Sequence, residues 1–438
     1  MNYKETCEYL YSQMPMFERQ GASGYKEGLS NTLALDIHFG HPHQSYKTIH
    51  VGGTNGKGSV SHTIAAVLQE SGYRVGLYTS PHLVDFRERI RVNGKPISEQ
   101  YVVDFVEKEH PFFEPLHPSF FEVTTAMAFK YFKDMNIDIA VVEVGLGGRL
   151  DCTNIITPLV SIITNISFDH TQFLGDTLAK IAGEKAGIIK RGVPVVIGET
   201  NEETRPVFEA KAQEMEAPIV FAEDENEILG EELLPEGGIR YHTKHMNDFI
   251  CDLGGIYQPK NLNTVFHALK QLRLQGYLCY SLKESNYEKC RIELQEALRN
   301  VCKKTGLMGR WQIMQQHPLV VCDTGHNVGG WQYISQQLQL VECRQMHIVF
   351  GMVDDKDVKG VLKMLPKDAK YYFTKANSKR AINEEKLREM AYEEGLMGMS
   401  YPSVSEAYKA AKNEALRDDF IFVGGSSYVV GDFLKNCF

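Results

Sequence analysis

Residues 48–72 read TIHVGGTNGKGSVSHTIAAVLQESG, and this stretch decides the fold. It begins with a short apolar run, passes through a glycine-rich loop that holds one lysine and one serine, and continues with apolar residues at helical spacing up to Gly72. Glycines allow the backbone N–H groups of such a loop to turn inward around phosphates, and the helix that follows presents its N-terminus to them. The sequence therefore predicts a strand, a phosphate-binding loop and a helix in succession.

The loop departs in two places from the general pattern G-x-x-x-x-G-K-[ST]. Val51 stands where the first glycine is usual, and Gly58 separates Lys57 from Ser59. A glycine-rich turn with a chance lysine would explain the loop without any function. The coincidence of strand, loop, lysine, hydroxyl and helix nevertheless favours phosphate binding.

Outward from this loop the chain alternates between strands and helices, which is typical of a parallel sheet covered on both faces. The later strands of this series are expected at 74–79, 139–144, 159–166 and 193–197, and its helices at 122–134, after a polar insertion, and at 178–190. Residues 239–242 and 249–253 resemble antiparallel strands, and helical patterning resumes over 261–275 and 287–304.

A second α/β series follows. Its strands are expected at 319–322, 347–350, 371–374 and 420–423, with helices at 384–394 and 405–416 among others. We therefore expect an α/β protein of two domains. Residues 1–300 form an N-terminal P-loop ATPase domain with a mostly parallel sheet, and residues 301–438 form a smaller, Rossmann-like α/β domain.

Composition narrows the function classes. The net charge of −9 gives no basic footprint for nucleic acid, so positive charge for a phosphate must be concentrated in a pocket. The nine cysteines form no CxxC pair, which indicates reduced thiols in a cytoplasmic protein. The N-terminal 19 residues lack the apolar core of a signal peptide, and no apolar stretch is long enough to span a membrane.

Polar residues follow several of the expected strands. Ser80 comes after the strand that ends near Thr79, Glu143 ends the next, and Asp169-His170 follow the strand over 159–166. Because ligands bind at the carboxyl ends of parallel strands, these groups are expected beside the phosphate loop as a magnesium site. Histidine is an unusual magnesium ligand, and each residue alone could be a polar group at a strand end.

Other candidates have a structural interpretation beside the functional one. Glu122 has the position of a capping acid in a first helical turn, and composition alone makes Lys185 an exposed lysine. The loops that begin at Asp323 and Gly424 both lie between a strand and a helix and could bind a small anion. Arg310 could form an interdomain salt bridge or reach a transferred phosphoryl group.

Taken together, these strings resemble the folylpolyglutamate synthase and dihydrofolate synthase family, which is related to the Mur cell-wall ligases. The phosphate loop is similar to the family's GTNGKGS string, and Gly58 favours the folate branch because Mur enzymes usually have a hydroxyl residue directly after the lysine. The other matching strings, in chain order, are Thr79–Leu83, Arg89-Ile90, Asn93-Gly94, Glu143–Asp151, Thr153-Asn154, Asp169-His170 and Gly183–Ile188.

The resemblance implies a role for each matching position. Thr54, Asn55, Gly56, Lys57, Gly58 and Ser59 would hold the ATP phosphates, with Asn261, Arg310 and Asp323 as further ATP contacts. The magnesium ligands would be Ser80, Glu143, His170 and Lys185, the last carbamylated, with Ser59 beside them. The pterin would bind at Ser80, Pro81, His82, Leu83, Phe121, Glu122 and Asp151, and the incoming glutamate near His326 and Ser426. We expect Lys57, His170, Lys185, Arg310 and His326 to act in catalysis.

The sequence also departs from the family pattern. Asp323-Thr324-Gly325-His326-Asn327 replaces the more usual DGAHNP, so that Val328 stands in place of a proline. Asp85-Phe86-Arg87 replaces an arginine-phenylalanine-asparagine string and moves a charge beside the pterin loop, and Cys152 replaces a frequent alanine. These departures concern the contacts to glutamate and pterin more than the chemistry.

The implied reaction has two steps. The substrate carboxylate attacks the γ-phosphate of ATP to give an acyl phosphate, and the amine of glutamate then forms the amide and releases phosphate. The acceptor is dihydropteroate, the glutamyl tail of a folate, or both, and we favour a bifunctional enzyme. Besides ATP and magnesium, the resemblance leaves room for K⁺ or another monovalent cation.

Two other functions remain open, a Mur-type cell-wall amino-acid ligase and a nucleotide-binding protein without ligase activity. The expected partners are small molecules, with no nucleic acid or membrane, and the expected assembly is a monomer.

Overall fold

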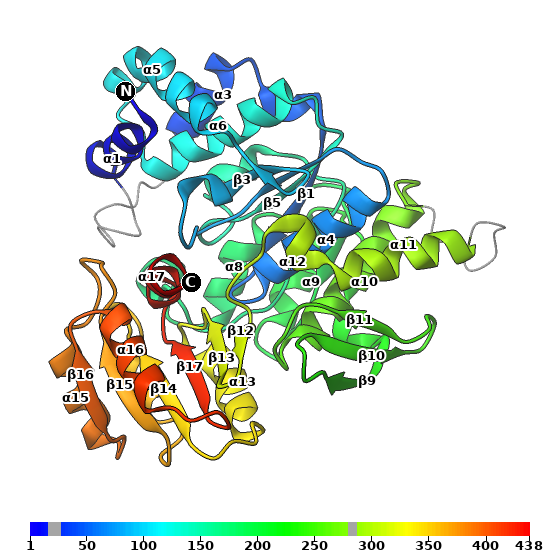
Figure 1. Cartoon of the computed structure of the whole chain (residues 1–438). Helices are drawn as coiled ribbons and strands as arrows, with labels where there is room; N and C mark the ends of the chain where they lie inside the picture. The colour runs from blue at the N-terminus through cyan, green and yellow to red at the C-terminus, as the bar shows by residue number, and fades with distance from the viewer. Residues whose placement is uncertain (16–27, 279–286) are drawn as a thin grey trace. The chain divides into compact units, whose positions relative to one another are not determined.

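The structure is a computed structural model, and it describes residues 1–15, 28–278 and 287–438. It divides into two compact units, each made of three chain segments (Figure 1). The first unit comprises residues 1–232, 240–252 and 259–307, and the second comprises residues 233–239, 253–258 and 308–438. The two short segments of the second unit were not expected from the sequence.

An eight-stranded sheet forms the centre of the first unit, with the strand order β4-β3-β2-β5-β1-β6-β7-β8. Neighbours from β2 to β8 pair in parallel, whereas β2–β3 and β3–β4 pair antiparallel. The prediction of a mostly parallel sheet is confirmed. The strands are β1 (Lys47–Gly52), β2 (Val75–Tyr78), β3 (Ile90–Val92), β4 (Lys95–Pro96), β5 (Ile139–Glu143), β6 (Ser161–Ile163), β7 (Val195–Ile197) and β8 (Ile219–Phe221).

Helices pack against this sheet through apolar side chains. α4 (Lys57–Glu70) contacts β1, β2 and β5, and α6 (Phe120–Asp134) contacts β2. Ala140 and Val142 of β5 belong to the apolar core that includes α6, so by strand alternation Glu143 faces the other side of the sheet. The remaining helices are α1 (Tyr3–Gln13), α3 (Ser30–His38), α5 (Glu99–Leu116), α7 (Thr171–Leu174), α8 (Leu178–Ala186), α9 (Arg205–Glu214), α10 (Gln258–Leu274), α11 (Tyr287–Arg299) and α12 (Val301–Thr305).

A small sheet of three strands has the order β11-β10-β9. β10 (Ile239–Thr243) and β11 (Phe249–Cys251) correspond to the two expected antiparallel strands, and their short connection excludes a parallel crossover. β9 (Ile228–Leu233) precedes them in the chain, at residues where no strand was predicted.

The second unit has a six-stranded sheet of order β12-β13-β17-β14-β15-β16, parallel throughout except for the β12–β13 pair. All four predicted strands are present, and the sequence missed only the edge strands β12 and β16. The strands are β12 (Gln312–Gln316), β13 (Leu319–Asp323), β14 (Met346–Phe350), β15 (Lys370–Thr374), β16 (Gly398–Tyr401) and β17 (Phe420–Gly424). The helices are α13 (Val328–Gln339), α14 (Val358–Leu362), α15 (Glu384–Glu393), α16 (Val404–Glu414) and α17 (Ser427–Cys437).

Two expectations for the first unit were wrong. The supposed polar insertion before residue 122 contains β3, β4 and the long helix α5, whose buried residues Val102, Phe105, Val106 and Phe113 follow a helical period. The single helix expected over 287–304 is two helices, because Asn300 leaves helical geometry with φ −129° and ψ 30°.

Asp252 serves as the cap of α12 from a distant part of the chain. Its carboxylate accepts hydrogen bonds from the backbone N–H groups of Val301 (3.1 Å) and Cys302 (2.8 Å). Burial raises the pKa of Asp252 to about 6, even though these hydrogen bonds act in the opposite direction. The folded protein therefore holds a proton here more tightly than the unfolded chain does.

Replacing Asp252 by asparagine is expected to stabilise the protein above about pH 6. A carboxyl with a raised folded-state pKa contributes stability below its ordinary pKa of 3.8 and loses it as the pH rises through about 6. Asparagine keeps an acceptor for the α12 N–H groups without the buried charge. We expect a gain on the order of 1 kcal/mol in urea unfolding at about pH 8, and a smaller one at about pH 5. A variant less stable than the wild type at about pH 8 would contradict this account.

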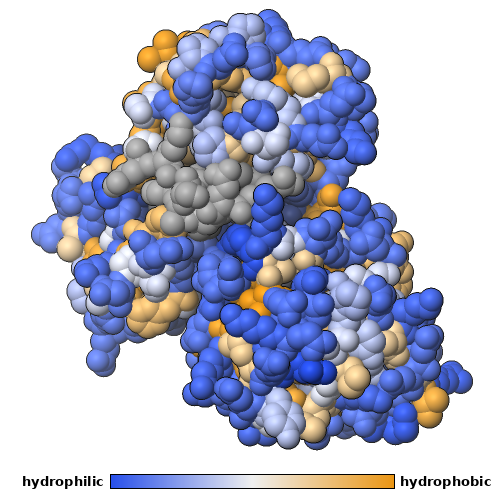
Figure 2. Space-filling model, turned by 90° about the vertical axis from the view of Figure 1, so that its left-hand side faces the viewer, coloured by the Kyte–Doolittle hydropathy of each residue, from blue (hydrophilic) through white to orange (hydrophobic). Residues whose placement is uncertain are grey.

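The surface seen in Figure 2 is mostly hydrophilic, with apolar residues in small groups. Within the described ranges, no helix has both the length and the apolar character that crossing a membrane requires.

Candidate active site

The phosphate loop joins β1 to α4 as the sequence predicts. β1 ends at Gly52 and α4 begins at Lys57, with Gly53 (φ +134°) and Gly56 (φ +85°) in backbone conformations that side chains disfavour. The loop is fastened to the segment after β6. Thr54 N donates to Asn165 O (2.9 Å), and Asn55 N donates to the side-chain oxygen of Asn165 (2.9 Å). The loop is therefore held in shape by its protein neighbours.

Substitution of Gly53 by alanine tests how tightly this loop is packed. A Cβ atom at Gly53 would lie 1.9 Å from the hydroxyl oxygen of Thr164 and 3.0 Å from its backbone nitrogen. We expect Gly53→Ala to lower the free energy of unfolding by about 2–5 kcal/mol in urea titrations. Gly72→Ala is the matched control, because Gly72 also has positive φ but a Cβ atom there would have no neighbour within 4 Å. Equal losses of unfolding free energy in the two variants would mean that backbone strain, and not the contact with Thr164, causes the loss.

Two lysines meet at one carbonyl group of this loop. Lys57 Nζ donates to Gly53 O (3.1 Å) and Thr54 O (3.0 Å), and Lys185 Nζ of α8 donates to the same Gly53 O (2.9 Å). Lys185 is buried, with 4% of its surface exposed, so the exposed lysine that composition favoured is wrong. Burial first, and the charge of Lys57 second, lower the pKa of Lys185 to about 7. A large share of Lys185 is therefore a neutral amine near neutral pH.

The polar residues at the strand ends lie along the same edge of the sheet. Glu143 is the β5 residue paired with Val51 of β1, and Tyr78 of β2 pairs with Val142, which brings Ser80 to the next strand end. Glu143 is 4% exposed, and Ser59 in the first turn of α4 is 1% exposed. His170 directly precedes α7 with φ 49° and has its Nε2 atom 3.7 Å from Asp169.

This edge offers few ligands for a metal ion from the protein alone. Within residues 1–15, 28–278 and 287–438, no three His, Cys, Asp or Glu side chains gather closely enough to hold an ion. A carboxylate, an imidazole and hydroxyl groups fit an ion that takes most of its ligands from phosphate oxygens and water, as magnesium does.

Asn261, in the first turn of α10, lies next to the phosphate loop. A Cβ atom at Gly56 would lie 2.2 Å from the side-chain oxygen of Asn261, so this amide lies directly over the loop glycine. The proximity agrees with a position beside the nucleotide phosphates. No local sequence pattern connects Asn261 with the loop, because about 200 residues separate them, and only the family resemblance predicted this position.

Three of the residues expected at the pterin have structural contacts. Glu122 completes a capping box at the start of α6, where it accepts from Ser119 N (2.6 Å). Asp151 accepts from Leu146 N (2.8 Å) and Thr153 N (3.0 Å), which fixes the loop after β5, and burial raises its pKa. Phe121 closes over Gly145, where a Cβ atom would lie 2.3 Å from the ring.

The loop after β2 carries the other expected pterin contacts and one departure from the family pattern. Pro81 is exposed, the backbone N–H of Leu83 donates to Glu88 (2.8 Å), and His82 Nδ1 accepts from Arg89 Nε (2.7 Å). Asp85 is paired with Arg87, whose Nε lies 2.9 Å from the carboxylate. Burial raises the pKa of Asp85, but the hydrogen bonds from Arg87 outweigh this and lower it overall. The negative charge of Asp85 is thus paired with the positive charge of Arg87, two residues later in the chain.

The second unit holds four candidate residues, Arg310 just before β12, Asp323 and His326 at the carboxyl end of β13, and Ser426 at the carboxyl end of β17. Asp323 at the end of β13 is 2% exposed and accepts from Tyr257 Oη (2.6 Å), Trp311 N (2.8 Å) and Gly325 N (2.8 Å). Burial raises its pKa despite these bonds. Asp323 therefore fixes both the loop before β12 and the loop after β13.

Its neighbours are positioned by that loop. Arg310 donates to Gly309 O (3.1 Å) and to the hydroxyl of Thr324, the residue that replaces a glycine in the family string. The Nδ1 atom of His326 lies 3.1 Å from Thr324 O, so Nδ1 carries the proton. Ser426 caps α17 by accepting from Val429 N (3.2 Å). No motif in the sequence indicated that Thr324 and Tyr257 hold these residues in place.

The chain is similar to known proteins over most of its length. Residues 51–250 match the Mur ligase middle domain, and residues 309–427 match the Mur ligase, glutamate ligase domain. The chain is 33% identical over 424 residues to a Bacillus subtilis protein named dihydrofolate synthase/folylpolyglutamate synthase, covering 94% of this chain and 95% of the relative.

Solved structures are similar over nearly the whole length. Escherichia coli FolC in complex with DHPP and ADP is 28% identical with a TM-score of 0.82, covering 99% of this chain and 97% of that one. A bifunctional folylpolyglutamate synthase/dihydrofolate synthase with Mn, AMPPNP and L-glutamate bound is 26% identical with a TM-score of 0.77, covering 98% and 97%.

Proposed function

The chain belongs to the dihydrofolate synthase/folylpolyglutamate synthase family, and we infer from this that it adds L-glutamate to pterin-containing carboxylates at the expense of ATP. It is an ATP-dependent ligase. We propose that it is bifunctional and uses both dihydropteroate and the glutamyl tail of reduced folates. Two of the three relatives named above carry both activities in their names, which supports this proposal.

The phosphate loop with its two lysines is the observation that carries the proposal. Lys57 and Lys185 both donate to Gly53 O, which places two amines at the point where the triphosphate of ATP would enter. Thr54, Asn55, Gly56, Lys57, Gly58 and Ser59 would hold the phosphates, and Asn261 would approach them over Gly56. Lys57 would neutralise charge as it develops on the transferred phosphoryl group.

Lys185 fits a carbamate. A neutral amine adds to CO₂ to form a carbamate anion and release a proton, and a pKa lowered to about 7 supplies that amine. The buried amine would thereby become an anion beside the polar strand ends. Carbamylated Lys185, Glu143, His170, Ser80 and Ser59 would then be the residues that hold Mg²⁺. When bound, Mg²⁺ would offset the negative charge of the phosphates.

The remaining roles concern the substrates. His82, Leu83 and Phe121 would contact the pterin ring, with Ser80 and Pro81 beside them. Glu122 and Asp151 would support this site through the hydrogen bonds described above. In the second unit, Arg310 and Asp323 would contact ATP, and His326 and Ser426 would bind the incoming glutamate. His326 Nδ1–H is fixed by Thr324 O, which orients its imidazole ring.

The experiment that tests this function measures phosphate release and product mass in one reaction. Purified protein with ATP and Mg²⁺ should release phosphate only when L-glutamate is present together with dihydropteroate or a reduced folate. Each product should be heavier than its acceptor by one glutamyl residue. Glutamate-independent hydrolysis at the same rate would contradict ligase activity. A product formed only from a UDP-linked muramyl acceptor would assign the chain to cell-wall chemistry instead.

A further inference from the structure

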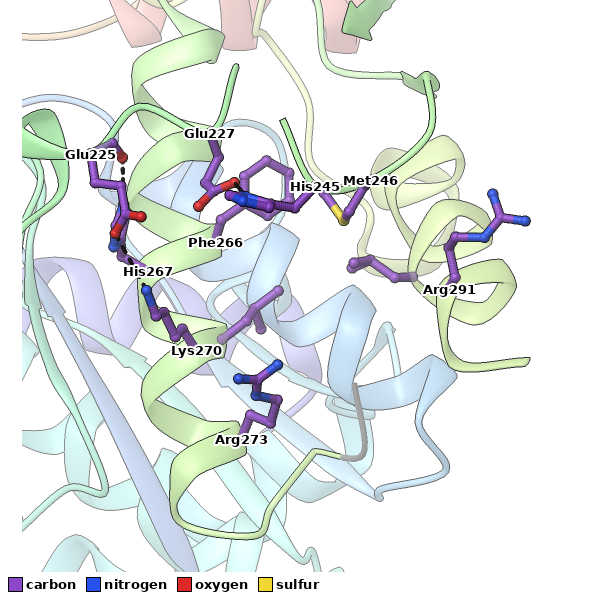
Figure 3. A pocket seen from close by; sticks show the side chains of 11 residues that line it. Glu225, Glu227, His245, Met246, Phe266, His267, Lys270, Arg273 and Arg291 are labelled. Atoms are coloured by element: carbon purple, nitrogen blue, oxygen red, sulfur yellow. Dashed lines mark hydrogen bonds and ion pairs between the residues drawn. The ribbon is translucent and has the colours of Figure 1, made fainter. Parts of the chain in front are cut away.

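A cavity of about 390 Å³ lies in the first unit, away from the phosphate loop. It is bounded by α10, by α11, by the segment before β9 and by the segment after β10 (Figure 3). None of its lining residues belongs to the phosphate loop or to the proposed magnesium and pterin sites. The volume falls within the range that small-molecule sites occupy in proteins.

The floor of the cavity is apolar and well supported. Phe266, Leu269 and Leu294 line it, and each has less than a tenth of its surface exposed. Phe266 packs edge-on against Phe249, with 5.9 Å between ring centroids, and Phe249 stacks on Tyr241 at 5.3 Å. This chain of rings holds the floor in place, and its apolar face suits a flat aromatic group.

The walls are fixed by hydrogen bonds from α10 to the segment before β9. Asn263 accepts from Glu227 N (3.0 Å), His267 Nε2 donates to Glu225 O (2.8 Å), and Lys270 pairs with the Glu225 carboxylate (3.3 Å). The Glu227 carboxylate contacts His245 (2.8 Å). Glu225 is therefore paired with Lys270, and Glu227 is paired with His245.

Positively charged side chains are among the residues that line the cavity. Arg273, one turn after Leu269 on α10, lies below the apolar floor, whereas the guanidinium group of Arg291 on α11 points away from the other lining side chains (Figure 3). Among the described lining residues, Lys270, Arg273 and Arg291 carry positive charge, and Glu225 and Glu227 carry negative charge. An anionic group on an aromatic ligand would thus find its complement at Arg273 while the ring covers the floor.

We propose that this cavity is an accessory binding site for a small aromatic compound that carries one carboxylate or sulfonate. The ring system lies on Phe266, Leu269 and Leu294, and the anionic group contacts Arg273. Met246 at the edge of the cavity covers the bound ring. The ligand would contact the same helix whose first turn places Asn261 over the phosphate loop.

The test uses 8-anilinonaphthalene-1-sulfonate, whose fluorescence rises in apolar surroundings, as the probe on the full-length protein. Saturable one-site binding is expected, and Arg273→Gln should raise the dissociation constant about tenfold through loss of one charge-assisted contact. Met246→Trp should abolish saturable binding by filling the cavity. Arg299→Gln is the matched control, because Arg299 is exposed on α11 and does not line the cavity, and its dissociation constant should stay within about twofold of wild type.

A neutral analogue, N-phenyl-1-naphthylamine, separates charge from apolar attraction. It should bind at least about tenfold more weakly, and Arg273→Gln should not change its affinity. Unchanged sulfonate affinity in Arg273→Gln, or no saturable binding to the wild type, would overturn the proposal. So would a signal that excess ADP with Mg²⁺ removes, because that signal would belong to the phosphate loop.

Discussion

Replacement of Lys185 by alanine is expected to reduce the rate of glutamate ligation by at least about a thousandfold. The variant loses the group that we propose becomes a carbamate beside the metal, and it leaves a cavity where a buried side chain contacted Gly53 O. Added bicarbonate should not restore activity, because alanine offers no amine to carbamylate. Initial rates of phosphate release, with glutamate and dihydropteroate both present, measure the effect.

Lys180→Ala is the matched control for this substitution. Lys180 belongs to the same helix, α8, but is exposed and pairs with Asp176 at 2.8 Å. It should keep nearly full activity. The carbamate itself can be observed in the wild type as a ¹³C signal after incubation with labelled bicarbonate, and that signal should be missing in Lys185→Ala. Retention of more than about a tenth of the wild-type rate by Lys185→Ala would show that the carbamate is not needed.

Replacement of Lys57 by methionine is expected to lower kcat/KM by about a hundredfold to a thousandfold. Methionine preserves much of the volume and removes the charge that the phosphate loop offers to ATP. The substitution has a second effect, because the charge of Lys57 contributes to the lowered pKa of Lys185. Without Lys57 the pKa of Lys185 rises, more of it is protonated near neutral pH, and less can form a carbamate.

The two effects of Lys57→Met can be separated by pH. Raising the pH deprotonates Lys185 again, so the activity of the variant should recover in part at alkaline pH, while its weakened affinity for a fluorescent ADP analogue should not. Lys47→Met, at the exposed start of β1, is the control and should behave as wild type. A variant with wild-type nucleotide affinity would contradict the role of Lys57 at the phosphates.

The sequence predicted the centre of each sheet well, because those strands are buried on both faces and show as continuous apolar runs. β1, β5, β13, β14, β15 and β17 all lie where they were expected. Edge strands were missed, since β12 and β16 are only partly buried and β4 has two residues. Pro111 and Pro115 concealed α5, although its apolar residues follow a helical period.

The candidate site divides in a similar way. Local strings predicted the phosphate loop and the helix that follows it, because strand, glycines and helix are contiguous there. The burial of a side chain could not be predicted from its neighbours in the sequence, and Lys185 is the clearest example. Its surroundings are set by Gly53, which lies far away in the sequence, so composition suggested an exposed lysine. Glu122, in contrast, has the capping position that its place before a helix predicted.

The three-segment construction of the second unit limits how evolution can recombine this enzyme. Two contacts within this unit come from residues that precede α10 in the chain. Tyr257 donates to Asp323, and the N–H of Ile256 donates to Gln337 (3.0 Å). A single crossover at Met308 would transfer β13 with Asp323 from one parent and leave its Tyr257 contact to the other. A crossover before Leu253 keeps that pair together, but Asn261 and the phosphate loop that it contacts then come from different parents. Exchange of this unit between lineages therefore requires compatible residues on both sides of the junction, which favours inheritance of the chain as a whole.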